Sequence, residues 1–371
     1  MDNVAGRKGS QIEAAKRKAV GGKRKRCTKG KSCSATCIAA NKICLVEIPW
    51  VSASSMSKAV KLIENRSATK SAIKVEKPGS NGIRFEGDKL IVGNETFTPG
   101  KKLPGSTQPT LYVDKEGKGK WVVKEGGAAG QNTAENTTNK VYNLLEPKLG
   151  TKGVDSTLVD GKAVNKFVEG GRTLDSLSQA EMRRFNVADK IKRSHLADAL
   201  VANWDYVGLV NDNIMVDKQG RLVRIDSGGT FQYRAQGGAK NFTPVPMEVW
   251  SLRSGQGAQF WSNASNDDYR NLWVNQTKAI ASEAPRLKSI VASSGLPDNV
   301  KTAFNRRVDA LSLVNSTLGS YNLPANTVSW KAVDSALERA FKASNSLDPN
   351  SPSWNKDFQS ELRKQLDKVF G

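Results

Sequence analysis

The sequence predicts an α+β protein in which a small β-rich part precedes a larger helical part. Between residues 82 and 171, short alternating apolar runs flank Gly-containing turns, as in antiparallel strands joined by hairpins. From about residue 246 to the C-terminus, apolar positions recur at helical spacing instead. At 371 residues the chain can bury one large core or two ordinary ones. Separate groups of strands and helices are typical of two packed lobes.

The β-rich part is predicted from three turn signals. The stretch GIRFEGDKLIVGNETF (82–97) predicts two strands about Gly87-Asp88. TLYVDKEGKGKWVVK (110–124) predicts a strand, a turn at Glu116–Gly119, and a second strand that ends at Lys124. That turn has two glycines, too few to predict a phosphate cradle of backbone amides. Residues 132–146 have helical spacing, and 156–171 predict two more strands.

The helical part begins with one long amphipathic helix over 179–202, in which apolar residues recur at three- to five-residue steps. The stretch NWDYVGLVNDNIMVDKQGRLVRIDSGG (203–229) then predicts a hairpin with arms IMV and LVRI. Helices follow to the end, including SWKAVDSALERAFKAS (329–344) and DFQSELRKQLDKVFG (357–371).

Positive charge is concentrated at the start of the chain. The formal net charge is +21, and residues 1–31 carry eleven Lys or Arg against two acidic residues. Such a basic arm attracts polyanions, of which nucleic acid is the class we expect; the alternative is a solvated tail with no dedicated partner. No apolar run approaches the roughly 20 residues of a membrane span, and no signal-like segment is present. We therefore expect a soluble protein without a membrane partner.

All four cysteines lie in one window, CTKGKSCSATCIAANKIC: Cys27, Cys33, Cys37 and Cys44. Four thiolates could close a tetrahedral zinc site, although the spacing lacks paired C-x2-C knuckles. Two disulfides, or four reduced and inert thiols, fit the spacing equally well.

Five polar residues occur in the order that phosphoryl transfer from ATP requires. Lys124 ends an apolar strand and could hold phosphates, and Glu135 on the following helix could pair with it. Asp205 follows the long helix, Asn213 opens the hairpin and Asp226 closes it. A hairpin returns its end to its start, so Asn213 and Asp226 are expected side by side, where an amide oxygen and a carboxylate can bind Mg²⁺.

The order D…N…IDSGG after a helix bearing His195 and Asp198 resembles the catalytic segment of the protein-kinase-like superfamily. The resemblance is to its atypical branches, the phosphatidylinositol-kinase-like, actin-fragmin-kinase-like and HipA-type kinases, and suggests a phage or bacterial member. The strand WVVK resembles their β3 lysine strand. The similarity covers roughly residues 80–250.

The resemblance implies a role for each of these residues. Asp205 would be the catalytic Asp, Asn213 and Asp226 the Mg²⁺ ligands, and Lys124 the phosphate-binding lysine with Glu135 as its partner. The hinge that meets adenine through its backbone would be NKFVEGG, at Phe167, Val168 and Glu169.

The implied fold is bilobal and protein-kinase-like. Residues 1–50 would form a basic, Cys-containing extension, 51–170 the β-rich N-lobe, and 171–371 the helical C-lobe with its catalytic segment at 195–240. The implied function is an ATP- and Mg-dependent phosphotransferase, and the basic extension favours a protein acceptor. We expect it in the cytoplasm of a bacterial host cell or in a virion.

The sequence is also consistent with a non-catalytic protein. The His-Arg-Asp triplet of typical kinases is replaced by Ala202-Asn203-Trp204-Asp205, and Asp205 and Asn213 are eight positions apart, a longer loop than usual. The alternative is a kinase-like structural protein, virion-associated or binding nucleic acid. A third interpretation is transfer of AMP.

Overall fold

The computed structural model describes residues 31–33, 36–38, 82–104, 107–128, 130–321 and 328–370. The chain divides into two compact units, Met1–Lys77 and Pro78–Gly371. The described part of the first unit is a strand pair, β1 (Lys31–Cys33) and β2 (Thr36–Ile38). Cys33 is registered with Thr36, and Cys37 with Ser32. The basic arm before residue 31, Cys27, Cys44 and the predicted helix at 54–75 lie outside the described residues.

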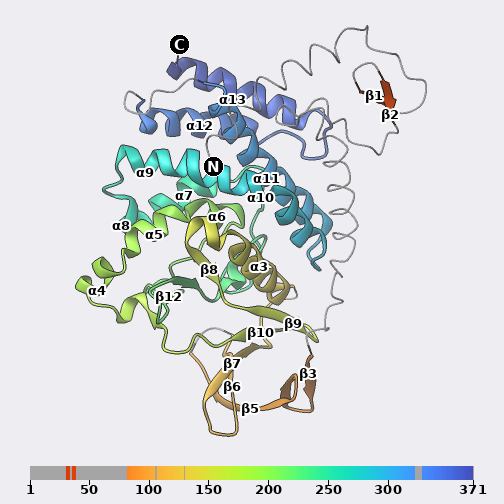
Figure 1. Ribbon diagram of the computed structural model, residues 1–371, viewed down its shortest axis with the longest axis vertical. Coiled ribbons are helices and arrows are strands. Elements are labelled where there is room, and N and C mark those ends of the chain that lie inside the picture. Colours follow the sequence, from red (N-terminus) through yellow and green to blue (C-terminus); the bar gives the residue numbers. More distant parts are fainter. Residues whose placement is uncertain are drawn as a thin grey trace. The chain divides into compact units, whose positions relative to one another are not determined.

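The second unit begins with a seven-stranded antiparallel sheet in the order β3-β4-β5-β6-β7-β10-β9 (Figure 1). Its strands confirm the three predicted hairpins and add β5, whose single buried residue, Phe97, leaves only a weak alternating pattern. The strands are β3 (Ile83–Glu86), β4 (Lys89–Val92), β5 (Glu95–Lys102), β6 (Thr110–Val113), β7 (Gly119–Lys124), β9 (Ser156–Val159) and β10 (Lys162–Lys166).

One long helix and a second, smaller sheet follow. The helix α3 (Gln131–Leu149) confirms the prediction for 132–146 and packs on β8, β9 and β10. The second sheet has the order β11-β12-β13-β8, with β8 parallel to β13 and the other pairs antiparallel. The predicted hairpin is thus confirmed. The strands are β8 (Thr151–Gly153), β11 (Arg172–Thr173), β12 (Ile214–Val216) and β13 (Leu222–Arg224).

The prediction of one helix over 179–202 is wrong. The segment forms α4 (Gln179–Arg184), α5 (Val187–Arg193) and α6 (His195–Leu200). Asn186 has a left-handed backbone, with φ of 51°, which no α-helix can continue through. Asn186 separates α4 from α5, whereas α5 and α6 meet at Ser194, whose φ of −111° and ψ of 7° also depart from helical values. His195, the sole histidine, is buried in α6, where its Nε2 lies 2.8 Å from the Val249 carbonyl oxygen.

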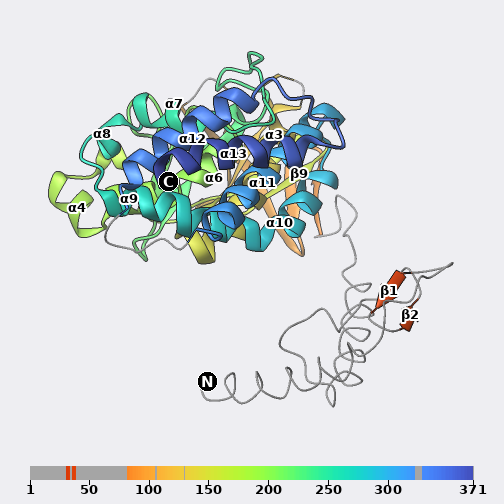
Figure 2. The same cartoon turned by 90° about the horizontal axis from the view of Figure 1, so that it is seen from above.

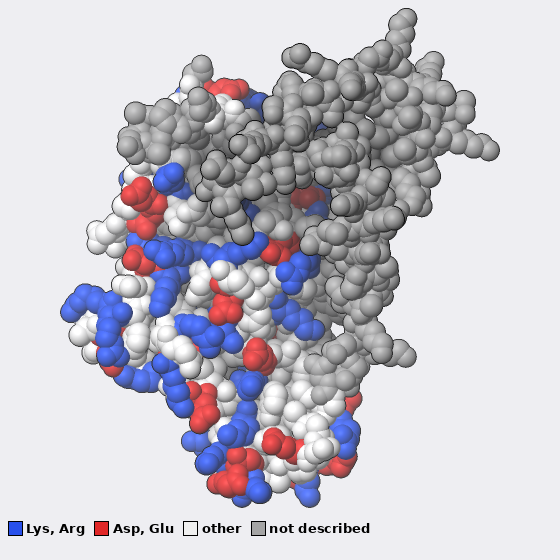
Figure 3. All heavy atoms as spheres, viewed as in Figure 1, with Lys and Arg blue, Asp and Glu red and all other residues white. Residues whose placement is uncertain are grey.

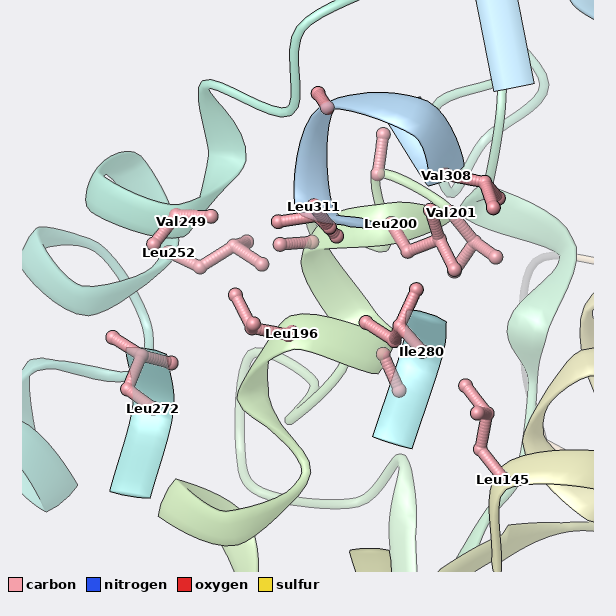
Figure 4. Packing of buried hydrophobic residues seen from close by; sticks show 14 of the residues in the cluster. Leu145, Leu196, Leu200, Val201, Val249, Leu252, Leu272, Ile280, Val308 and Leu311 are labelled. Carbon is pink, nitrogen blue, oxygen red and sulfur yellow. The ribbon is translucent and has the colours of Figure 1, made fainter. Parts of the chain in front are cut away.

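From Glu248 onward the described part is mainly helical, as predicted, and α12 and α13 lie alongside each other (Figure 2). The central α6 packs Leu196 and Leu200 against residues of α7, α10 and α11 (Figure 4). No helix in the described ranges has the length and apolar character needed to cross a bilayer. The helices are α7 (Glu248–Ser254), α8 (Ala258–Trp261), α9 (Asn266–Arg270), a π-helical turn (Asn271–Gln276), α10 (Thr277–Ala292), α11 (Asp298–Leu318), α12 (Trp330–Ser344) and α13 (Trp354–Phe370).

Candidate active site

Lys124 joins three elements through its ammonium group. Its Nζ lies 2.9 Å from Glu135 Oε2 on α3 and 2.6 Å from Asp226 Oδ1 after β13. The side chains of Lys124 and Glu135 are 7% and 2% exposed, whereas that of Asp226 is 52% exposed. The structure therefore brings together three of the predicted site residues, with one carboxylate buried and the other reaching solvent.

The buried partner Glu135 is held in place by Asn165 on β10. Asn165 Nδ2 donates to Glu135 Oε1 over 2.8 Å, and β10 pairs with β7 so that Asn165 lies opposite Val122. Burial alone would lower the pKa of Lys124, but the two carboxylates outweigh it and hold that pKa above its ordinary value. Lys124 is therefore a fixed cation at neutral pH.

The backbone of Asp226 has a left-handed conformation, which sets the direction of its side chain. Its φ is 52°, in the left-handed region that side-chain-bearing residues enter infrequently. Two residues later, a Cβ on Gly228 would meet Gln131 Nε2 at 3.0 Å and Glu135 Oε2 at 3.4 Å, so glycine permits the close approach to α3. Ile225 N donates to Asn213 O over 3.0 Å, which places Asn213 and Asp226 at the same open end of the hairpin, as expected.

Asp205 lies in the loop after α6 and is fixed at both carboxylate oxygens. Asn213 Nδ2 donates to Asp205 O over 2.7 Å and to Oδ2 over 3.2 Å, and Gln256 Nε2 donates to Oδ1 over 2.9 Å. Burial raises the pKa of Asp205; these hydrogen bonds oppose the rise and the charge of Asp226 adds to it. A carboxylate with a raised pKa is a better proton acceptor than an ordinary aspartate.

The oxygen atoms at this site suit Mg²⁺. The hydrogen bonds among the described residues use neither Asn213 Oδ1 nor Asp226 Oδ2, so an amide oxygen and a carboxylate oxygen are free to bind a hard cation. In the described ranges, no group of three or more His, Cys, Asp or Glu side chains could hold a metal ion. An amide oxygen and a carboxylate oxygen are ligand types that Mg²⁺ accepts, with phosphate oxygens and water completing its shell.

The predicted hinge residues Phe167, Val168 and Glu169 follow β10 directly. Phe167 N donates to Lys120 O over 2.8 Å, so this amide is already bonded within the sheet. The three residues line a cavity of about 340 Å³ together with Asp217 and other residues of the β12–β13 turn. The residues predicted to carry the reaction, which are Lys124, Glu135, Asp205, Asn213 and Asp226, do not line this cavity. Contact of this backbone with adenine stays a prediction.

The loop nearest Lys124 is the β5–β6 connection and not the turn at 114–118 that precedes β7 in the sequence. Thr110 is registered with Val123 and with Lys102, so the β5–β6 connection lies at the Lys124 end of β7, and the turn at 114–118 lies at the opposite end. Here a cavity of about 420 Å³ is lined by parts of the β5–β6 connection, Gly126, Gly127 and Gln131. Strand register places the β5–β6 connection beside Lys124, and the sequence alone does not specify that register.

Lys240 was missed by sequence reasoning, although it ties the loop of Asp205 to the loop of Asp226. Its Nζ lies 2.5 Å from Ala202 O and 2.7 Å from Gly229 O, and 5.1 Å from the centre of the Trp204 ring. Burial lowers its pKa to about 7. A lone lysine after a glycine-rich loop carries no periodic signal, so only the fold shows this contact.

A second ion pair lies beneath the hairpin. Arg224 on β13 donates from Nη2 to Asp198 Oδ2 on α6 over 2.5 Å and from Nε to Oδ1 over 2.9 Å. Tyr142 OH on α3 donates to the same carboxylate over 2.8 Å. This buried cluster supports the strand that ends two residues before Asp226.

Comparison with solved structures gives partial likenesses, and two kinases are among them. No family model and no curated protein sequence matches the chain. A structure of the Helicobacter pylori proinflammatory kinase CtkA overlaps 61% of this chain and 97% of its own, at 11% identity and a TM-score of 0.38. The choline kinase LicA from Streptococcus pneumoniae overlaps 72% of this chain and 92% of its own, at 15% identity and a TM-score of 0.26.

Proposed function

We propose that the chain is an ATP- and Mg-dependent phosphotransferase of atypical kinase-like fold that acts on a protein acceptor. The observation that carries this proposal is the position of Lys124 Nζ, between a buried Glu135 and a half-exposed Asp226. A cation fixed by one carboxylate and placed beside a second, solvent-reaching carboxylate is what binding of a metal-nucleotide requires.

Each residue has one task in the proposed reaction. Lys124 binds the α- and β-phosphates, and Glu135 keeps it in place. Asn213 and Asp226 would hold Mg²⁺, which neutralises phosphate charge when bound. The acceptor hydroxyl oxygen forms a bond to the γ-phosphorus while the bond from that phosphorus to the β–γ bridging oxygen breaks and ADP leaves. Asp205 accepts the hydroxyl proton, for which its raised pKa suits it.

Thermal stability and label transfer test this function together. ATP with Mg²⁺ should raise the melting temperature of the full chain, and γ-labelled ATP should label an acceptor protein. Asp226→Ala should lose both effects. If the parent protein shows no nucleotide-dependent stabilisation, the proposed ATP site is wrong.

Nucleic-acid binding through residues 1–31 is a second candidate, supported by eleven basic residues against two acidic ones in that segment. On the face of the described part seen in Figure 3, blue and red side chains are interspersed. Deleting residues 1–31, which removes nine of the 21 net positive charges, should weaken salt-sensitive DNA binding. DNA binding by the parent without any transfer of label would favour a non-catalytic protein.

A further inference from the structure

A large aromatic cavity lies beside the loop that carries Asp205. It is open to solvent and has a volume of about 710 Å³, and residues of α7, α8 and α12 line it. Trp204, the residue before Asp205, lines it, and Trp250, Trp261 and Tyr269 supply further aromatic surface. None of the five residues assigned to phosphoryl transfer lines this cavity, so its contents are separate from the nucleotide.

The charged groups of the cavity are already paired. Arg253 Nη2 lies 3.0 Å and 2.9 Å from the two carboxylate oxygens of Asp334. Arg307 donates to Glu248 over 3.1 Å. Lys342 lies 2.7 Å from Glu338. With each charge compensated, the walls attract neither a cation nor an anion, and they favour an uncharged occupant.

The same walls contain hydrogen-bond donors that have no partner. Nε1 of Trp250, Nε1 of Trp261 and Nη1 of Arg253 are buried and make no hydrogen bond within the described structure. A buried donor without an acceptor costs free energy, and these three donors belong to residues that line the cavity, so an occupant whose neutral oxygen atoms reach them is favoured. Backbone carbonyl oxygens of a peptide meet this requirement.

Apolar surface continues along the Asp205 loop beyond the cavity. The exposed large hydrophobic residues of the described chain are Trp204 (42%), Leu209 (89%) and Val210 (61%), all within this one loop. Leu209 and Val210 do not line the cavity, so a small molecule inside it would leave them uncovered. An extended polypeptide is long enough to cover both.

We propose that this cavity anchors the acceptor polypeptide by an uncharged aromatic or large aliphatic side chain near the hydroxyl to be phosphorylated. The loop of Leu209 and Val210 packs on the adjoining part of the same polypeptide. This inference rests on the proposed phosphotransferase function and adds its substrate specificity. Burial of one large apolar side chain accounts for at least about 10-fold in affinity.

A peptide library tests the anchor. The full chain, γ-labelled ATP and Mg²⁺ are combined with Ser-, Thr- or Tyr-containing peptides in which each flanking position is varied in turn. We expect Trp, Phe, Leu or Met to be selected at one position and charged residues to be rejected. Ser251→Trp fills the cavity from its exposed edge and should raise KM for the selected peptide at least about 10-fold, with little change in kcat or ATP affinity.

Ser335→Trp is the matched control, because Ser335 is also an exposed helical serine but does not line the cavity. Fluorescence polarisation of peptides from the same library, without ATP, measures binding apart from chemistry and does not depend on label transfer. Stabilisation by ATP together with label transfer that shows no apolar selection, or equal effects of the two Trp variants, overturns the anchor and leaves the proposed function standing. Peptide binding that Ser251→Trp weakens, without any effect of ATP, supports the anchor and overturns the phosphotransferase.

Discussion

Two ion pairs lie at the end of β13 and differ in their exposure to solvent. In the pair of Arg224 and Asp198, the side chains are 1% and 0% exposed. In the pair of Lys124 and Asp226, they are 7% and 52% exposed. The first pair joins α6 to β13 and has protein partners on both sides; the second leaves one carboxylate oxygen of Asp226 without a hydrogen bond.

This difference in exposure distinguishes a pair that stabilises the fold from a pair whose carboxylate is accessible to a ligand. A fully buried pair is costly to break, because the remaining charge stays in a medium of low polarity. A pair with one exposed member costs little to rearrange, and its free oxygen can bind a metal or phosphate group. The exposure of Asp226, more than the charge of the pair, is therefore the feature on which the proposed active site rests.

The largest effect is expected for Arg224→Met. It leaves the Asp198 carboxylate buried without its cation and should lower the free energy of unfolding by about 3–5 kcal/mol, measured by urea denaturation. Arg221→Met is the control, since Arg221 is 48% exposed in its pair with Asp217 and should cost no more than about 1 kcal/mol. Equal losses of unfolding free energy for the two variants would show that burial does not set the stability of an ion pair in this protein.

Asp226→Asn should lower the rate of label transfer by about 10²–10³-fold, as loss of a charge-stabilising group does. The unfolding midpoint should change little, because Asp226 is half exposed and Lys124 keeps Glu135. Single-turnover kinetics and thermal unfolding are measured on the same preparation. A loss of stability as great as that of Arg224→Met would mean that Asp226 is structural.

Lys240→Met should lower the free energy of unfolding by about 1–3 kcal/mol, because two buried carbonyl oxygens lose their donor. Lys190→Met, which removes a single bond to Gly220 O, is the control and should cost less. Unfolded lysine keeps its proton up to its ordinary pKa of 10.5, whereas folded Lys240 releases it above about 7. The parent should therefore gain stability over the variant as pH rises from 7 to 10.5, and a constant difference would contradict this.

Gln256→Leu should have the smallest effect, a shift in the pH dependence of label transfer. The reaction needs ionised Asp205, and its rate falls as pH drops through the raised pKa of that carboxyl. Gln256 stabilises the ionised form, so its loss moves the acidic limb to higher pH, by up to about one unit. Gln259→Leu removes a hydrogen bond to Asn211 instead and should leave the profile in place. No shift in the first variant would argue against Asp205 as the proton acceptor.

Local patterns predicted much of the fold and site. The hairpins at Gly87-Asp88 and Asp160-Gly161 form as predicted, because turn chemistry and alternation act within a few residues. The proximity of Asn213 and Asp226 follows from the same rule. The helix over 179–202 was predicted wrongly, since periodicity does not show that the backbone departs from helical angles at Asn186 and Ser194.

By itself, the sequence determined which residues could carry the chemistry and their order along the chain, because strand, helix and hairpin signals are local. The tertiary structure alone decided which carboxylate stays exposed, that Lys240 joins two loops, and that an aromatic cavity adjoins Asp205. Contacts such as Gln256 to Asp205 and Arg224 to Asp198 span 51 and 26 residues. They form only when separate elements pack, and exposure is a property of that packing.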